Sequence, residues 1–212
     1  METFLTLLSG IGWIIVYEEC IRLGFKHKSY SMPLWALGLN FAWETIYSFS
    51  DIFLNAHGSL EDTMTLVQVI ANVVWAFLDI VILYTYFKYG KKEATHPISK
   101  KFFVPWTVLV VVCCFIIQIT FIIEFDFVMA AQYSAFLQNL MMSVLFIQMY
   151  LKRNSLEGQS LLLAIAKWIG TLAPTLLMGV MTFNIVVLVC GIFCSIFDLI
   201  YIYLIATHNK RN

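Results

Sequence analysis

"LNFAWETIYSFSD", residues Leu39 to Asp51, decides the class of this protein, because it places a carboxyl group, that of Glu44, inside an apolar helical segment. The surrounding run, 34–54, is long enough to cross a hydrocarbon core of about 30 Å. An ionisable group at the centre of a membrane helix costs about 2.5 to 3.5 kcal/mol even on the mildest scale, so it usually faces the bundle interior and has a function. The stretch therefore indicates a membrane helix with a functional polar face.

The composition of the whole chain agrees with a membrane protein. Of its 212 residues, 61% are hydrophobic and 12% are charged, whereas a soluble domain has about 25% charged residues. Its apolar runs predict seven helices, at about 4–23, 34–54, 64–87, 102–123, 127–151, 161–181 and 184–206. We predict an all-α protein in which residues 1–212 form a single integral membrane domain, a bundle of seven transmembrane helices.

The charged residues orient this bundle, since Lys and Arg collect in cytoplasmic loops. The basic residues follow the first, third, fifth and seventh spans: Arg22, Lys26, Lys28, Lys88, Lys91, Lys92, Lys100, Lys101, Lys152, Arg153, Lys210 and Arg211. The opposite ends carry only acids: Glu2, Glu61, Asp62, Glu124 and Asp126. This distribution predicts an N-terminus outside and a C-terminus in the cytoplasm.

Lys167 is the one basic residue that falls within a span. The simpler interpretation is that its long apolar stem lets the ammonium group snorkel to the cytoplasmic headgroups. The other interpretation is that Lys167 pairs with an acid inside the membrane.

Polar residues lie on one face of each of three predicted spans, at helical spacing. Span 34–54 carries Asn40, Trp43, Glu44, Tyr47 and Asp51, and span 64–87 carries Gln68, Asn72, Trp75, Asp79 and Tyr86. Span 184–206 carries a looser stripe of Asn184, Gly191, Ser195, Asp198 and Tyr201. At about 1.5 Å per residue, Glu44 lies roughly 15 Å from the inner end of its span, and Asp79 and Asp198 roughly 12 Å from theirs. The three acids can meet in one pocket if the helices pack suitably; alternatively, they only hold the helices together.

A carboxyl group in an apolar pocket favours its protonated form and can act as a general acid. Aromatic rings nearby attract cations with their negative faces, and the spans contain several: Trp13, Tyr17, Trp43, Tyr47, Trp75 and Trp168. An acid, aromatic rings and a dry cavity together favour the acid-initiated cyclisation of a polyene. The alternative is that Trp and Tyr simply lie at the membrane interfaces.

Other chemistries lack their motifs in this chain. It contains no DDxxD cluster for magnesium-dependent diphosphate ionisation, no DxDD run and no P-loop. The histidines lie in predicted loops, away from the cysteines of the spans, so we expect no metal site. We also expect no organic cofactor and no nucleic-acid partner.

Several stretches resemble one family. "NFAWE" (residues 40–44), "NVVWAFLD" (72–79), "SVLFIQMYLKRNSLEGQS" (143–160), "KWIGTLAPT" (167–175) and "SIFDLIYIYL" (195–204) are similar to the integral-membrane terpene cyclases of fungal meroterpenoid and indole-diterpene pathways, the paspaline-cyclase-like family. The resemblance covers nearly the whole chain. It implies that Glu44 matches the essential glutamate of the second span and Asp198 the essential aspartate of the last span, and that Asp79 matches a further polar position.

The resemblance implies a metal-independent cyclase of the isomerase or lyase type. Such an enzyme protonates an epoxide or a terminal olefin of a lipophilic prenylated acceptor and guides the cation through ring closures. We expect Glu44 to be the general acid and Asp198 its partner or the stabiliser of the developing cation. The pocket would be lined by Asn40, Trp43, Tyr47, Asn72, Trp75, Asp79 and Ser195.

The same resemblance places the protein after a prenyltransferase, and possibly an epoxidase, in terpenoid secondary metabolism. Its membrane would be the bacterial cytoplasmic membrane or the eukaryotic endoplasmic reticulum. Two alternatives use the same acids differently: a small proton-coupled transporter or a seven-helix sensor would relay protons through them. A purely structural membrane subunit is a third alternative, disfavoured by the cost of three buried acids.

Overall fold

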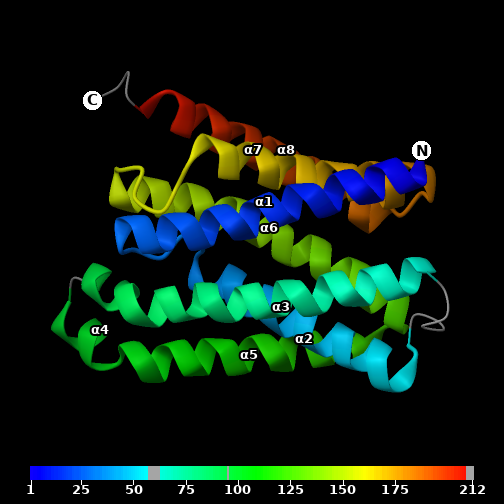
Figure 1. Ribbon diagram of the computed structural model, residues 1–212, viewed down its shortest axis with the longest axis horizontal. Coiled ribbons are helices and arrows are strands. Elements are labelled where there is room, and N and C mark those ends of the chain that lie inside the picture. The colour runs from blue at the N-terminus through cyan, green and yellow to red at the C-terminus, as the bar shows by residue number, and fades with distance from the viewer. Residues whose placement is uncertain (57–62, 95, 209–212) are drawn as a thin grey trace.

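The computed structural model describes residues 1–56, 63–94 and 96–208. Within these ranges the regular structure is entirely helical (Figure 1). The elements are α1 (Glu2–His27), α2 (Leu34–Leu54), α3 (Thr63–Tyr89), η1 (Gly90–Glu93), α4 (Pro97–Lys101), α5 (Phe103–Glu124), α6 (Phe127–Arg153), α7 (Leu161–Pro174), η2 (Thr175–Met181) and α8 (Ile185–Ala206). All seven predicted helices are therefore present as helices, with boundaries close to the expected ones.

Six helical segments within the described ranges are long and apolar enough to cross a membrane: α1, α5, α6, α8 and the continuous segments Thr65–Glu93 and Leu161–Met181. The remaining predicted span is α2, which has 21 residues and carries the acids Glu44 and Asp51. It packs chiefly against α3, α5 and α6. Its buried positions include Asn40, Glu44 and Tyr47, as the sequence pattern predicts.

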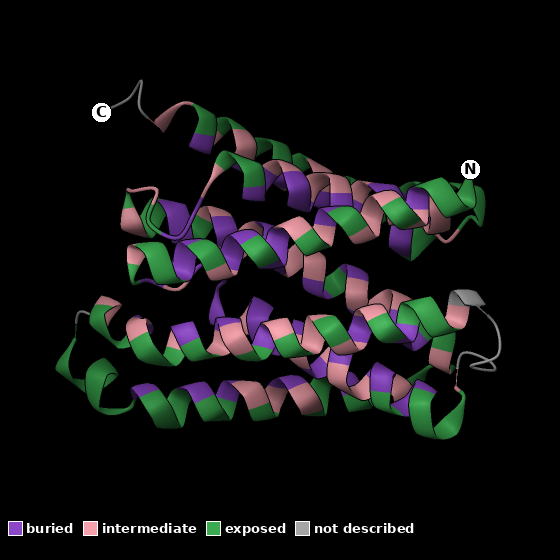
Figure 2. Ribbon diagram, viewed as in Figure 1, coloured by how far each residue is buried: buried purple, intermediate pink, exposed green. Residues whose placement is uncertain are grey.

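The helices form two groups, which meet where α1 packs on α3 and where α2 and α5 pack on α6 (Figure 1). Helix α1 packs on α7, and α8 packs on α6 and α7, whereas α3 and α5 both pack on α2. Figure 2 shows that the buried residues line the contacts between helices, while much of the outer surface of α3, α5 and α8 is exposed. Those exposed residues are largely apolar, for example Phe77, Ile116 and Phe193, as expected for helices that contact lipid.

Span 161–181 is not one regular α-helix. Pro174 ends α7, because its ring has no N–H to donate and clashes with the preceding turn. The chain continues as a π-helix, η2, a form that often marks functional or strained sites. This segment packs tightly on α8: a side chain at Gly191 would collide with Thr175, and one at Gly179 would lie 2.9 Å from the backbone of Leu188.

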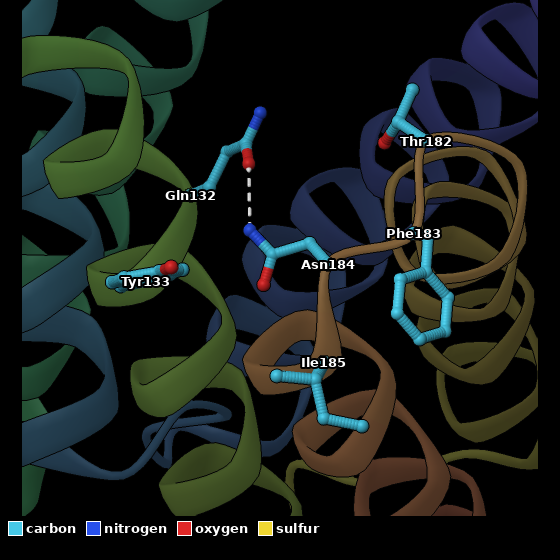
Figure 3. A pocket seen from close by; sticks show the side chains of 6 residues that line it. All are labelled: Gln132, Tyr133, Thr182, Phe183, Asn184 and Ile185. Carbon is cyan, nitrogen blue, oxygen red and sulfur yellow. Dashed lines mark hydrogen bonds between the residues drawn. The ribbon is translucent and has the colours of Figure 1, made fainter.

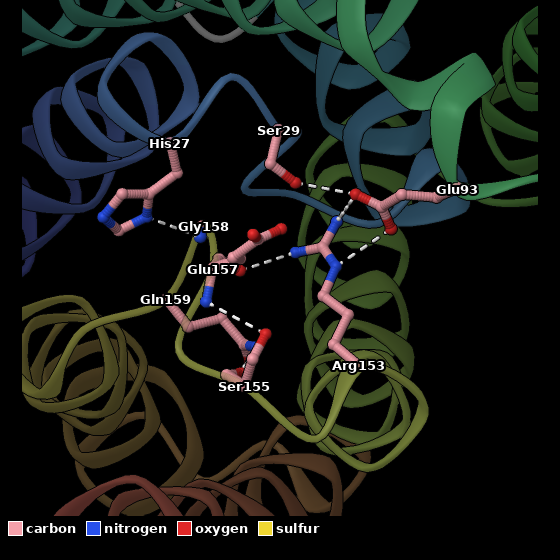
Figure 4. A network of polar contacts seen from close by, with 8 residues as sticks. All are labelled: His27, Ser29, Glu93, Arg153, Ser155, Glu157, Gly158 and Gln159. Carbon is pink, nitrogen blue, oxygen red and sulfur yellow. Dashed lines mark hydrogen bonds and ion pairs between the residues drawn. The ribbon is translucent and has the colours of Figure 1, made fainter.

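One end of the bundle gathers the ends of α1 and α6, the α3–α5 connection and the last described residues (Figure 1). Arg153 at the end of α6 donates to both carboxylate oxygens of Glu93, at 2.7 and 2.9 Å, and Ser29 donates to the same group at 2.7 Å. Figure 4 shows this network, together with the bond from the Gly158 N–H to Nδ1 of His27, 3.0 Å long. The loops that carry the described basic residues therefore meet at one end.

This arrangement agrees with the expected sorting of charges, but the side of the membrane on which this end lies stays a prediction. Four residues that contribute to the orientation lie outside the described residues: Glu61, Asp62, Lys210 and Arg211.

Candidate functional site

The centre of the candidate site is a pair of buried carboxyl groups, on α2 and α3. Glu44 is 5% exposed and Asp79 is 0% exposed. The two side chains interact electrostatically, whereas Oε2 of Glu44 and both carboxylate oxygens of Asp79 are buried without a hydrogen-bond partner among the described residues. The phenol of Tyr17, from α1, donates to Oε1 of Glu44. Because two neighbouring negative charges would repel each other strongly in an apolar medium, the pair is suited to hold a proton.

A chain of hydrogen bonds leads to Glu44 from the far side of α2. Gln118 on α5 donates to Oε1 of Gln138 on α6 at 2.8 Å, and Gln138 donates to Oδ1 of Asn40 at 3.0 Å. Asn40 then donates to the Tyr17 hydroxyl at 3.2 Å, and Tyr17 donates to Glu44. Every donor in this chain points toward the carboxyl pair, so the chain fixes the orientation of the Glu44 carboxyl group.

Aromatic rings cover the same site. Trp75, one helical turn from Asp79, stacks on Tyr17 with ring centroids 6.2 Å apart and an interplanar angle of 17°. Trp13 lies on α1 at 6.4 Å from the Tyr17 ring. Ring faces close to an acid can stabilise a cation that forms beside it.

A second cluster of buried charge lies on α6, α7 and α8. Lys167 donates to both carboxylate oxygens of Asp198, at 2.8 and 3.0 Å, and to the hydroxyl of Ser143 at 2.7 Å. Lys167 and Asp198 are both 0% exposed. Lys167 therefore pairs with a buried acid and does not snorkel.

Some of the predicted site residues lie at the Glu44–Asp79 pair, and others lie elsewhere. Asn40, Glu44, Trp75 and Asp79 come together around Tyr17. Asp198 lies in the second cluster, because α8 packs chiefly on α6, α7 and η2. Of the three acids, Glu44 and Asp79 therefore lie together, and Asp198 pairs with Lys167 instead. The periodicity of the sequence is equally compatible with all three acids in one pocket.

The other predicted residues have neighbours of their own. Trp43 donates to the carbonyl of Ala131 on α6 at 3.1 Å, and Tyr47 packs on Phe127 with ring centroids 5.0 Å apart. Asn72 accepts a 2.8 Å bond from Gln68 on the same helix. Ser195 is partly buried on α8, one turn before Asp198.

Gln118, Gln138 and Ser143 were not predicted as participants, and Tyr17 was predicted only as one of the aromatic residues. Each of the three missed residues is a polar residue inside an apolar span. Because a polar group inside the membrane usually faces the bundle interior, the three residues could have been identified from the sequence in the same way as those of the other spans.

The described surface includes at least two hollows. One, of about 470 Å³, is where η2 turns into α8; Figure 3 shows its lining, with Asn184 donating to Gln132 at 3.4 Å. The other, of about 260 Å³, is an apolar groove between α2, α5 and α6 that is lined in part by Gln118 and Gln138. The lining of the first hollow contains no carboxyl group, histidine or lysine, so we locate the chemistry at the carboxyl pair and not in that hollow.

Among the described residues, no group of three or more His, Cys, Asp and Glu side chains could hold a metal ion. The five cysteines are free thiols. The chemistry that the site offers by itself is proton transfer from a carboxyl group beside aromatic rings.

Comparison with known proteins gives a consistent result. The chain is 28% identical to the terpene cyclase andB of Emericella variicolor over 184 residues, which are 85% of this chain and 74% of that protein. It is 26% identical to the Pyr4-family terpene cyclase mfmH of Annulohypoxylon moriforme over 82% of this chain and 68% of that protein. It is 29% identical to the terpene cyclase pyr4 of Aspergillus fumigatus over 51% of this chain and 41% of that protein.

No solved structure matches the chain significantly. The family described as Pyr4-like transmembrane terpene cyclases matches residues 1–210, nearly the entire sequence. With several long apolar helices and a buried acid at its centre, the chain belongs to the Pyr4-like transmembrane terpene cyclases, a family of membrane-bound enzymes.

Proposed function

We propose that the protein cyclises a lipophilic prenylated acceptor by protonating its terminal epoxide or olefin, with Glu44 as the general acid. The observation that carries this proposal is the Glu44–Asp79 pair. Among the described residues, the Glu44 carboxyl group interacts with Tyr17 and Asp79, neither of which carries a positive charge. A proton, and not a cation, therefore balances the pair, and that proton is available to a substrate.

The proposed reaction neither adds nor removes atoms. Glu44 gives its proton to the epoxide oxygen, the C–O bond opens, and the electrons of successive double bonds close the rings. The last cation loses a proton, which restores the protonated carboxyl pair. Trp75, Tyr17 and Trp13 are placed to stabilise the positive charge as it develops next to Glu44.

Asp198 has a different role in this proposal. Its carboxylate is neutralised by Lys167, so it is poorly suited to donate a proton. We assign it to positioning: the ion pair holds α7 and α8 together beside the core residues Phe146 and Tyr201. If Asp198 instead stabilises the cation directly, a folded variant that lacks its carboxylate will make no cyclic product.

The proposal includes the topology and the cellular setting. We place α2 as a seventh span, with the N-terminus outside and the basic end of the bundle in the cytoplasm. The membrane is the bacterial cytoplasmic membrane or the endoplasmic reticulum, and a prenyltransferase, with an epoxidase for epoxide substrates, supplies the acceptor. The family gives no support to the transporter or sensor alternative.

The test is Glu44→Gln, assayed in membranes fed an epoxidised prenyl acceptor, with products identified by mass spectrometry. General acid catalysis contributes about 10²- to 10⁴-fold, so the cyclisation rate should fall by that factor while unfolding is little changed. Glu18→Gln, an exposed carboxylate on α1, is the matched control and should keep wild-type activity. Cyclisation by Glu44→Gln at the wild-type rate would show that the assignment is wrong.

A further inference from the structure

A row of three buried amide side chains, Gln118, Gln138 and Asn40, connects α5 and α6 to the helix that carries the acid. Gln138, in the middle of the row, accepts from Gln118 at 2.8 Å through Oε1 and donates to Oδ1 of Asn40 at 3.0 Å through Nε2. A side-chain amide accepts at its oxygen and donates at its nitrogen. Because both ends of the Gln138 amide are engaged, its orientation is fixed.

Gln138 in turn determines the orientation of the Asn40 amide. Nε2 of Gln138 needs an acceptor and bonds to Oδ1 of Asn40, which leaves Nδ2 of Asn40 to donate to the Tyr17 hydroxyl at 3.2 Å. In the reverse orientation Asn40 would present its oxygen to Tyr17 and would accept the single proton of the phenol. The observed orientation therefore leaves that proton for Glu44.

This direction makes the two oxygens of the Glu44 carboxyl group different. Oε1 accepts from Tyr17, whereas Oε2 has no hydrogen-bond partner among the described residues. In a protonated carboxyl group one oxygen carries the hydrogen, and the other remains the acceptor. The bond from Tyr17 therefore favours a Glu44 proton on Oε2.

The bond from Tyr17 to Glu44 also becomes stronger as the proton leaves. A hydrogen bond to a carboxylate is roughly twice as strong as one between neutral groups. An interaction that is stronger in the transition state than in the ground state raises the rate of the chemical step. A residue that keeps Tyr17 donating to Glu44 thus assists proton transfer without touching the substrate.

We infer that Gln138 is a positioning residue for this proton transfer: by orienting the Asn40 amide, it makes Tyr17 donate to Oε1 of Glu44 and leaves the transferable proton on Oε2. The inference rests on the proposed function for the role of Glu44 as the general acid. It adds a residue from α6 to the catalytic machinery and names the oxygen that gives up the proton.

The test is infrared spectroscopy of the protein in nanodiscs, because it reports on Glu44 without a substrate. Isotope-labelled glutamate separates the C=O stretch of a protonated glutamate from that of an aspartate such as Asp79, and loss of the band in Glu44→Gln assigns it. A hydrogen bond to the carbonyl oxygen lowers this frequency. Gln138→Leu should therefore raise it, as Tyr17→Phe should, and Gln148→Leu, which changes an exposed glutamine on the same helix, should leave it unchanged.

A second measurement connects the spectrum with the reaction. In membranes fed an epoxyfarnesylated phenol, Gln138→Leu should lower kcat by roughly two- to tenfold, the contribution of one hydrogen bond, and leave KM unchanged. A purely structural role would lower the yield of folded protein but would not move the infrared band. Gln118→Leu removes only the first donor of the row and should raise the frequency by a smaller amount, which provides the result if Gln138→Leu does not fold.

The inference is wrong if the Glu44 band stays in place in folded Gln138→Leu protein or, where that variant does not fold, in Gln118→Leu. It is also wrong if the wild-type spectrum contains no protonated glutamate band that Glu44→Gln removes. The spectra need no catalysis. A Glu44→Gln protein that still cyclises would therefore overturn the proposed function without altering the infrared result.

Discussion

Lys167 and Asp198 form an ion pair in which neither side chain has any exposed surface, with Nζ 2.8 Å from Oδ1. Removing one member of such a pair leaves an uncompensated buried charge, at a cost of about 3 to 5 kcal/mol. Replacing both by apolar residues of similar volume is often neutral. A comparison of single and double variants of this pair therefore distinguishes a structural role of Asp198 from a catalytic one.

We expect Lys167→Met to lower the free energy of unfolding by about 3 to 5 kcal/mol, and the double variant Lys167→Met/Asp198→Leu to recover most of that loss. Unfolding in detergent, followed by circular dichroism, measures both. Lys88→Met, which removes an exposed lysine, should change stability little. If the double variant folds and cyclises, Asp198 is a positioning residue; if it folds but makes no cyclic product, Asp198 acts directly on the cation.

Tyr17→Phe should lower kcat by about tenfold or more and leave KM nearly unchanged. The variant keeps the ring that stacks on Trp75 but loses the hydroxyl that donates to Glu44 and accepts from Asn40. Two buried groups lose a partner, so the free energy of unfolding should also fall by about 1 to 3 kcal/mol.

Tyr201→Phe is the control for that loss of stability. Its hydroxyl is equally buried and donates to Gln159 at 3.0 Å. It should reduce stability but not kcat. Equal effects of the two variants on kcat would contradict a positioning role for Tyr17.

Asp79→Asn should reduce cyclisation by at least about tenfold, because the amide cannot share a proton with Glu44 as a carboxyl group does. The product assay on membranes gives the rate, and unfolding in detergent confirms that the variant is folded. Glu124→Gln changes an exposed carboxylate at the end of α5 and should have no effect. A fully active Asp79→Asn protein would show that Glu44 works without its neighbour.

Arg153→Lys should destabilise the end of the bundle at which Arg153 binds Glu93. The guanidinium group makes two bonds to Glu93 and one to the carbonyl of Glu157, and it lies 4.2 Å from the centroid of the Tyr30 ring. A lysine cannot reproduce this planar fork, so we expect a loss of about 1 to 3 kcal/mol and faster proteolysis in the segment 90–101. Lys152→Arg, at an exposed neighbouring position, should leave both measurements unchanged.

Gly12→Ala should destabilise the packing of α1 on α7. A Cβ atom at Gly12 would lie 2.9 Å from the backbone of Gly170, whereas one at Gly10 would meet nothing within 4 Å. Small residues let membrane helices approach closely. Gly10→Ala should therefore be neutral or slightly stabilising, as expected for helix propensity alone, and similar unfolding of the two variants would contradict this contact.

Much of the fold could be predicted from the sequence, because apolar runs and their helical periodicity reflect local constraints. The inward faces of α2 and α3 were predicted from spacing alone, and in the structure Glu44 and Asp79 are buried and Trp75 is partly buried. Helix α7 ends at Pro174, and the π-helical continuation of the span was not predictable from the sequence. The partners of Asn72 and Trp43 were not predictable, because they depend on rotamers and on the neighbouring helix.

The sequence by itself determined that this is a helical membrane protein with acids placed at the depth of the hydrocarbon core, since hydropathy and periodicity are properties of single segments. Only the tertiary structure decided which acids meet. Glu44 joins Asp79 because α3 packs on α2, and Asp198 joins Lys167 because α8 packs on α7. The physical reason is that the spacing of residues in the sequence determines the helix face on which a side chain lies, whereas the partner of that side chain depends on how the helices pack.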